Sequence, residues 1–201
     1  MKDDYSIPDK EVLDGQRNQW EDSFAKRQDM FTSDPSDPAR NAASLFSKEG
    51  KTKILELGAG QGRDTIFFAQ SGFKVYAIDY SENGLSTIRE KAEEGGFAEQ
   101  IITRHNDVRN KLLFEDESFD ACYSHMLFCM ALTTAELEFL CAEVRRVLKP
   151  GGLNIYTARH IGDAHYGIGI HRGEDMYEVG GFIVHFFSKE GSNILQKALR
   201  S

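Results

Sequence analysis

The sequence of 201 residues has few of the features that mark secreted or membrane proteins. It has three cysteines, Cys122, Cys129 and Cys141, and no two of them stand in a C-x-x-C pair. Such a sparse, odd set is typical of reduced thiols rather than of a disulfide framework. No apolar run reaches the roughly 18 residues of a membrane span, and residues 1–5 are polar, unlike a signal peptide. We therefore expect a cytoplasmic protein that does not bind membranes.

Positive charge is also scarce. The chain has 24 Lys and Arg against 32 Asp and Glu, a formal net charge of −8, and no basic run. Proteins that bind nucleic acid usually present a basic patch to the phosphates, so we expect no nucleic-acid partner. The length suits a single domain, residues 1–201, with a sizeable hydrophobic core.

Three glycines at alternate positions follow a short apolar segment that carries Glu56. They are Gly58, Gly60 and Gly62. Glycine permits backbone conformations and close approaches that a Cβ forbids, and a strand, a glycine loop and a helix together form a nucleotide cradle. The dinucleotide pattern G-x-G-x-x-G would need a glycine at position 63, where the sequence has Arg63. This substitution disfavours a nicotinamide-dependent oxidoreductase, which remains an alternative that titration with NAD would test.

Strands and helices are predicted to alternate along the chain. Strands are expected at 53–57, 74–79, 101–106, 119–125 and 153–158, and helices at 10–30, 39–47, 63–71, 81–95 and 133–148. This alternation predicts an α/β fold with a doubly wound, mostly parallel sheet. Ligands bind such sheets beyond the carboxyl ends of the strands, near the point where the strand order reverses.

Useful side chains stand where the predicted strands end. An acid at Asp79 is placed to accept hydrogen bonds from two ribose hydroxyls. After the third strand, the carboxylate of Asp107 suits an adenine amino group, and Val108 suits the face of the ring. S-adenosylmethionine (SAM) explains this set better than NAD, because it has no pyrophosphate and carries two cationic groups that favour acidic neighbours.

Residues 50–160 resemble the class I SAM-dependent methyltransferases, and look closest to the branch with ubiquinone/menaquinone-biosynthesis and tellurite-resistance-like enzymes. The matching segments are 56–62, 75–81, 106–108, 118–120 and 145–152. The resemblance implies a Rossmann-like sheet with strand order 3-2-1-4-5, SAM as cofactor, and methyl transfer to a small-molecule nucleophile. A SAM-binding sensor or partner protein without transferase activity is the alternative.

The resemblance also implies roles for individual residues. The glycines would approach the methionine part of the cofactor, Tyr80 would flank the adenine, and Ser124 and His125 would line the site of methyl transfer. The predicted cofactor-binding residues are Glu56, Gly58, Gly60, Gly62, Asp79, Tyr80, Asp107, Val108 and Ser124. His125 and His165 are candidate general bases, which are needed only if the acceptor holds its proton at neutral pH. For His125, a buried histidine of the core is an equally good interpretation.

Two further segments are candidates for the substrate site. The stretch from His160 to Asp175 is rich in histidine, glycine and acids, and reads either as a solvated loop or as an active-site loop. In the second case His171, Arg172, Glu174 and Tyr177 would contact a polar substrate. Trp20, with Phe24 and Phe31, is either ordinary helix packing or part of a lid that keeps out water. No metal site is expected, because His125 and Cys129 supply only two ligands.

The C-terminal part departs from the family pattern. Only 43 residues follow Ala158, so the usual final hairpin of strands 6 and 7 is expected to be missing or reduced. Either the sheet has five strands, or residues 166–187 supply extended structure, or a partner covers the edge, with self-association through this region as one outcome. The expected organisation is therefore a helical lid at 1–49, a SAM-binding core at 50–160, and a substrate loop with a final helix at 161–201.

Overall fold

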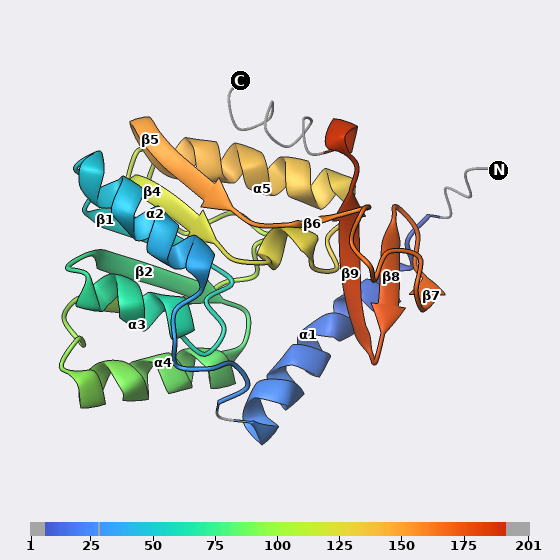
Figure 1. Cartoon of the computed structure of the whole chain (residues 1–201), viewed down its shortest axis with the longest axis horizontal. Helices are drawn as coiled ribbons and strands as arrows, with labels where there is room; N and C mark the ends of the chain where they lie inside the picture. The colour runs from blue at the N-terminus through green and yellow to red at the C-terminus, as the bar shows by residue number, and fades with distance from the viewer. Residues whose placement is uncertain (1–6, 28, 192–201) are drawn as a thin grey trace.

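The structure, a computed structural model, describes residues 7–27 and 29–191. Five parallel strands form the central sheet in the order β3-β2-β1-β4-β5 (Figure 1). The prediction of a doubly wound sheet with order 3-2-1-4-5 is confirmed. The strands are β1 (Lys53–Leu57), β2 (Lys74–Asp79), β3 (Ile101–His105), β4 (Phe119–Ser124) and β5 (Leu148–Tyr156).

Helices cover both faces of this sheet. One face packs against α2 (Asp37–Lys48), α3 (Arg63–Gln70) and α4 (Glu82–Gly95), and the other packs against α5 (Thr134–Val147). Each side has its own apolar cluster because successive side chains of a strand point to opposite faces. The hydroxyls of Ser36, Ser81 and Thr133 begin α2, α4 and α5 by accepting a backbone N–H of the first turn.

The register of the strands brings the predicted site residues to one edge. Glu56 on β1 lies opposite Ala77 of β2 and opposite Tyr123 of β4. Asp79 ends β2 one strand away from the glycine loop that follows β1. Because all five strands are parallel, their carboxyl ends share this edge, and the loops that follow them meet there.

The C-terminal segment forms a second, small sheet rather than extending the first. Its order is β6 (Arg159–His160), β9 (Phe182–Phe187), β8 (Met176–Val179) and β7 (Ile170–His171). Strands β8 and β9 form an antiparallel hairpin, so residues 166–187 do supply extended structure, but beside the central sheet. In the described part of the chain, no strand pairs with the outer edge of β5. Self-association through this region stays a prediction.

The N-terminal helix α1 (Lys10–Lys26) lies between the second sheet and α4 (Figure 1). The side-chain amide of Gln16 donates to Gly181 O at 2.8 Å and accepts from Ile183 N at 3.0 Å. On the same helix, the Trp20 ring lies 4.6 Å from that of Phe182, measured between centroids. The helix therefore ties the hairpin to the central domain. It is shorter than the predicted 10–30.

The predicted final helix falls mostly outside the described residues, which end at 191. Within the described part of the chain, no helix has the length and apolar character needed to cross a bilayer. The three cysteines are free and buried.

Candidate functional site

A cavity opens at the carboxyl edge of the central sheet. Its sheet side consists of residues at the carboxyl ends of β1, β2, β3 and β4 and in the loops that follow these strands. Its lid side consists of Trp20 and Phe24 from α1 and of Phe31 from the loop after it. The residues that complete the lining are Glu56, Gly58, Ala59, Gly60, Gln61, Arg63, Asp64, Asp79, Tyr80, Asn106, Val108, His125, Met126, Leu127 and Met130.

The three glycines have left-handed backbone conformations, with φ of 67° at Gly58, 54° at Gly60 and 82° at Gly62. Side chains with a Cβ are strained there. A Cβ at Gly60 would lie 3.4 Å from the ring of Phe24, and one at Gly62 would lie 2.7 Å from Ile88 of α4. Gly58 and Gly60 line the cavity, whereas Gly62 packs on Ile88 and lies outside the lining.

The Asp79 carboxylate links the glycine loop to the start of α4. One carboxylate oxygen accepts a hydrogen bond from Gly60 N at 2.9 Å, and the other accepts from Ser81 N at 2.8 Å. Burial raises the pKa of Asp79, although these backbone donors oppose the rise. Each oxygen keeps a lone pair, so the same carboxylate can still accept hydrogen bonds from a ligand.

Glu56 is a buried carboxylate with a single hydroxyl partner. Its Oε2 accepts from Thr65 Oγ1 at 2.6 Å. Burial, together with the negative charge of Asp64, raises its pKa to about 8. The Glu56 carboxyl is therefore protonated at neutral pH, and a cationic group bound beside it would favour its ionised form.

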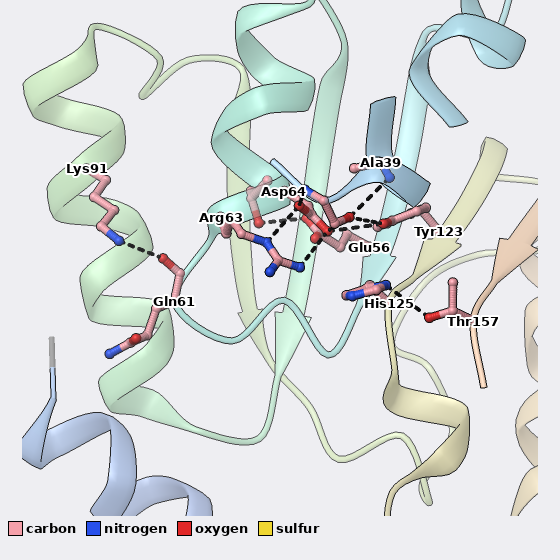
Figure 2. Close-up of polar contacts among 11 residues, drawn as sticks. Ala39, Glu56, Gln61, Arg63, Asp64, Lys91, Tyr123, His125 and Thr157 are labelled. Carbon is pink, nitrogen blue, oxygen red and sulfur yellow. Dashed lines mark hydrogen bonds and ion pairs between the residues drawn. The ribbon is translucent and has the colours of Figure 1, made fainter. Parts of the chain in front are cut away.

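Asp64, in the first turn of α3, is the centre of a hydrogen-bond network. It accepts from Ser36 N and Ser36 Oγ, both at 2.8 Å, from Tyr123 Oη at 3.1 Å and from Arg63 Nε at 3.0 Å (Figure 2). Burial alone would raise its pKa, but the donors Arg63 and Ser36 hold the pKa of Asp64 below the ordinary value. The network joins the start of α2, the glycine loop and β4 around one ionised carboxylate.

Gln61 connects the glycine loop to the lid side. Its amide nitrogen donates to Arg27 O at 2.5 Å, and its amide oxygen accepts from Met30 N at 2.9 Å. The side chain is buried, with 4 % of its surface exposed. On the other side of the loop, Lys91 of α4 donates to Gln61 O at 3.3 Å and pairs with Asp29 at 3.3 Å (Figure 2). The loop that follows α1 is therefore held against the glycine loop from both sides.

His125 faces the cavity just after β4. Its Nδ1 lies 3.0 Å from Thr157 Oγ1, which also accepts from Met126 N at 2.8 Å (Figure 2). Burial lowers the pKa of His125, and the charges of Asp64 and Arg63 act in opposite directions on it. The imidazole is therefore neutral at pH 7, with its orientation fixed by Thr157. The next residue, Met126, has a left-handed φ of 67°, a conformation that is uncommon outside glycine and asparagine.

The cavity gathers eight of the predicted site residues, namely Trp20, Glu56, Gly58, Gly60, Asp79, Tyr80, Val108 and His125. Ser124 is fully buried behind this surface, and its hydroxyl has no hydrogen-bond partner among the described residues. Asp107 lines a smaller adjoining cavity, where it pairs with Arg109 at 2.7 Å. Arg109 also pairs with Asp14 of α1. Asp107 is thus engaged with an arginine, and its contact with adenine stays a prediction.

The predicted substrate residues of the C-terminal segment lie elsewhere, on the second sheet and its loops. Arg172 pairs with Glu178 on the neighbouring strand, and Glu174 accepts from Thr134 N at 2.6 Å at the start of α5. His171 lies against Tyr177, with ring centroids 5.1 Å apart. His165 is an exposed residue that pairs with Asp163 at 2.8 Å. None of these five residues contributes to the cavity lining in the described structure.

Sequence reasoning did not single out several residues of the site. Asp64, Gln61 and Arg63 stand directly in or after the glycine loop, so their position was a usable signal. Asn106 lines the cavity, and its buried side-chain oxygen has no hydrogen-bond partner within the part of the chain that the structure describes. Thr157 had no signal, because its role depends on the pairing of β4 with β5, which places Ser124 opposite Tyr156.

The donor set fits SAM. The left-handed glycines leave room for close backbone contact, and the Asp79 carboxylate has free lone pairs for ribose hydroxyls. The buried Glu56 carboxyl suits a cationic neighbour, and the unpartnered Asn106 oxygen can accept a hydrogen bond. In the described part of the chain, no three His, Cys, Asp or Glu side chains are grouped to hold a metal ion.

Comparisons with known proteins point to the same family as the sequence does. A family model described as "Methyltransferase domain" matches residues 54–152. The chain is 34% identical over 113 residues to a demethylmenaquinone methyltransferase of Tropheryma whipplei, covering 56% of this chain and 44% of that protein. It is 38% identical over 113 residues to phosphoethanolamine N-methyltransferase 1 of Triticum aestivum, covering 55% of this chain and 22% of that protein.

A solved structure supports the same fold over a longer stretch. The 1,6-didemethyltoxoflavin-N1-methyltransferase of Burkholderia thailandensis, with its substrate and S-adenosylhomocysteine (SAH) bound, matches with a TM-score of 0.72 at 21% identity. The match covers 96% of this chain and 79% of that one. With these matches, the chain resembles the class I SAM-dependent methyltransferases along residues 54–152. It matches less than half the length of the demethylmenaquinone methyltransferase and about a quarter of the wheat protein.

Proposed function

We propose that this chain binds SAM in the cavity and transfers its methyl group to a small-molecule nucleophile. The observation that carries the proposal is the meeting of the glycine loop, Glu56 and Asp79 with His125 across one cavity. When bound, SAM supplies a methyl group already activated by the positive sulfur. The protein then has to position the two reactants and keep water out.

The residues of the chain divide this work. Gly58 and Gly60 admit the methionine part, Asp79 accepts from the ribose, and Glu56 in its ionised form balances positive charge. Trp20 and Phe24 on the lid side cover the cavity against water. Residues 1–49 act as the lid and residues 50–160 as the cofactor-binding core.

His125 is the residue that we place at the acceptor. Thr157 Oγ1 can accept a hydrogen bond from the Nδ1–H of His125, which leaves the Nε2 lone pair free for a proton from the acceptor. His165 is less suited to this role, because it lies outside the cavity lining and its Nδ1 is paired with Asp163. The relatives named above act on a quinone precursor, a phosphorylated amine and a fused heteroaromatic ring, according to their names, and all are small molecules.

Two experiments test the proposal in sequence. Isothermal titration should show binding of SAH and none of NAD, and NAD binding alone would favour an oxidoreductase. Incubation with isotope-labelled SAM and metabolite extracts should then give a labelled small molecule by mass spectrometry. His125→Gln should reduce its formation without changing SAH affinity. If SAH binds and no extract gives a labelled product, the chain is a SAM-binding sensor or partner protein instead.

A further inference from the structure

The lid side of the cavity is aromatic and the surface around His125 is apolar. Trp20, Phe24 and Phe31 come from the lid, and Met126 and Met130 flank the short 3-10 helix Leu127–Cys129. The Trp20 and Phe24 rings are 5.5 Å apart between centroids and tilted by 41°. Side chains of this kind gain free energy from contact with a flat apolar ring.

The charges of the cavity disfavour an anionic acceptor. Among the residues that line it, Arg63 is the one with a permanent positive charge. Its guanidinium is bound to the Asp64 carboxylate through Nε at 3.0 Å and a second nitrogen at 3.3 Å, and it lies over the Phe31 ring at 5.7 Å. Among the described residues of the lining, no cation without a carboxylate partner is left to pair with a phosphate or carboxylate, and an added anion would lie near the buried Asp64 carboxylate.

A cationic acceptor is also a poor fit. Aromatic rings do attract cations, but the sulfonium of the cofactor already places a fixed positive charge in this cavity. A protonated amine, moreover, has no lone pair with which to attack the methyl carbon.

Resting on the function proposed above, we infer that the acceptor is a neutral molecule with an aromatic or similarly flat ring, bound between the lid side and His125, whose nucleophilic atom carries a proton. A hydroxyl or a ring N–H attached to such a ring meets this description.

The transfer step balances with the groups at hand. The nucleophilic atom forms a bond to the methyl carbon while the carbon–sulfur bond breaks. The electron pair of the broken carbon–sulfur bond stays on sulfur. The proton of the nucleophile passes to His125 Nε2. The imidazolium that results releases this proton to solvent after the products leave, which is favourable because burial disfavours the charged ring.

The acceptor class can be tested without knowing the natural substrate, with three ligands that share one ring system. The protein with bound sinefungin, a SAM analogue that cannot transfer a methyl group and carries a protonated amine in place of the sulfonium, is titrated in a calorimeter with 2-naphthol, with 2-naphthyl phosphate and with 2-(aminomethyl)naphthalene, which are neutral, anionic and cationic at pH 7. We expect 2-naphthol to bind at least about tenfold more tightly than either charged analogue. Equal or tighter binding of a charged analogue, or no binding of 2-naphthol, would overturn the inference.

A matched pair of variants shows where 2-naphthol binds. Phe31 on the lid side and Phe139 on α5 are exposed to nearly the same extent, 43% and 42%. Phe31→Ala should weaken 2-naphthol binding about fivefold, and Phe139→Ala should leave it unchanged. Should Phe31→Ala fail to fold, Phe31→Leu takes its place in the same comparison. Equal effects of the two variants would show that the ring binds elsewhere.

SAH affinity separates this inference from the proposed function. If SAH itself does not bind to the unmodified chain, the proposed function fails. If SAH binds normally and 2-naphthol does not, only the acceptor class is wrong. In the variants, SAH affinity should change less than about twofold, since Phe31 is placed on the acceptor and not on the cofactor.

Discussion

The sheet side of the cavity is made of residues within a few positions of a strand end, whereas the lid side is made of α1 and the loop after it. Glu56 and Asp79 lie within strands, and Gly58 comes directly after β1. Trp20, Phe24 and Phe31 belong to segments that the central sheet does not contain. The sheet side therefore requires only that the strands pair in order. The lid side requires separate contacts, through Gln61, Ser36 and Gln16, to be placed at all.

This difference has a consequence for stability as well as for binding. The sheet side shares its residues with the buried core, so a change there affects both cofactor affinity and folding. The lid side is attached by hydrogen bonds and ring contacts outside the central sheet, such as those of Gln61 and Trp20, so a change there should loosen it locally. Four variants test this difference between the two sides of the cavity.

Gly60→Val should have the largest effect. The variant combines a strained backbone, at φ 54°, with a branched side chain that meets Phe24 inside the cavity. We expect SAH affinity to fall about a hundredfold or more, roughly 3 kcal/mol, by calorimetry. Gly50→Val is the matched control, because Gly50 has a similar φ of 65° and no neighbour within 4 Å of its added Cβ. Equal affinities for the two variants would remove the glycine loop from the site.

Glu56→Gln should change how stability depends on pH. The pKa of Glu56 is about 8 in the folded protein against an ordinary value of 4.5, so between these pH values the folded state holds a proton that the unfolded chain has released. The free energy of unfolding of the parent should therefore fall as pH rises through this window, by a term on the order of 3 kcal/mol. The glutamine variant lacks this term.

Melting curves from pH 5 to pH 8, without ligand, measure the effect. Glu138→Gln, a change at an exposed position of α5, should keep the slope of the parent. A Glu56→Gln variant with the same slope as the parent would show that the buried carboxyl is ionised throughout.

Asp79→Ala should weaken SAH binding by about 1–3 kcal/mol, the usual size for hydrogen bonds to a charged group. It should also lower the melting temperature, because Gly60 N and Ser81 N lose their acceptor. Calorimetry and thermal unfolding check the two effects, with the exposed Asp22→Ala as control. A change in stability alone, with normal affinity, would make Asp79 purely structural.

Gln61→Ala should have the smallest effect on affinity, about 1 kcal/mol, because its side chain holds the lid loop rather than the cofactor. Amide hydrogen exchange should rise in residues 29–36 while the central strands stay protected. SAH should slow exchange across residues 10–40 of the parent and less so in the variant. Gln70→Ala, at an exposed position on α3, should behave as the parent. Unchanged exchange in Gln61→Ala would mean that the lid side is held by other contacts.

The central sheet and the sheet side of the site could be predicted because their signals are local. A short apolar run, a glycine at a left-handed turn and an acid at a strand end each depend on neighbours in sequence, as at Leu57, Gly58 and Asp79. The partner of Asp107 could not be predicted in this way. Arg109 is only two residues from Asp107, but its guanidinium pairs with both Asp107 and Asp14 of α1. The position of Arg109 therefore depends on where α1 packs.

The second sheet shows the same limit at the C-terminus. Extended structure in residues 166–187 was one of the alternatives that the sequence left open, and it did not show which neighbour the strand β9 (Phe182–Phe187) would pair with. In the structure it pairs with β8 and with the two-residue strand β6, and Arg172 and Glu174 are held by contacts of that subdomain rather than by the cavity.

The sequence by itself determined where the strands lie along the chain, the glycine loop and the acids at the strand ends, because each rests on backbone geometry set within a few residues. Only the tertiary structure decided which side chains complete the cavity. Thr157 beside His125, Ser36 on Asp64 and Arg27 on Gln61 are pairs separated by 32, 28 and 34 residues. Such contacts form only when distant elements pack, and no short pattern in the chain records which elements those are.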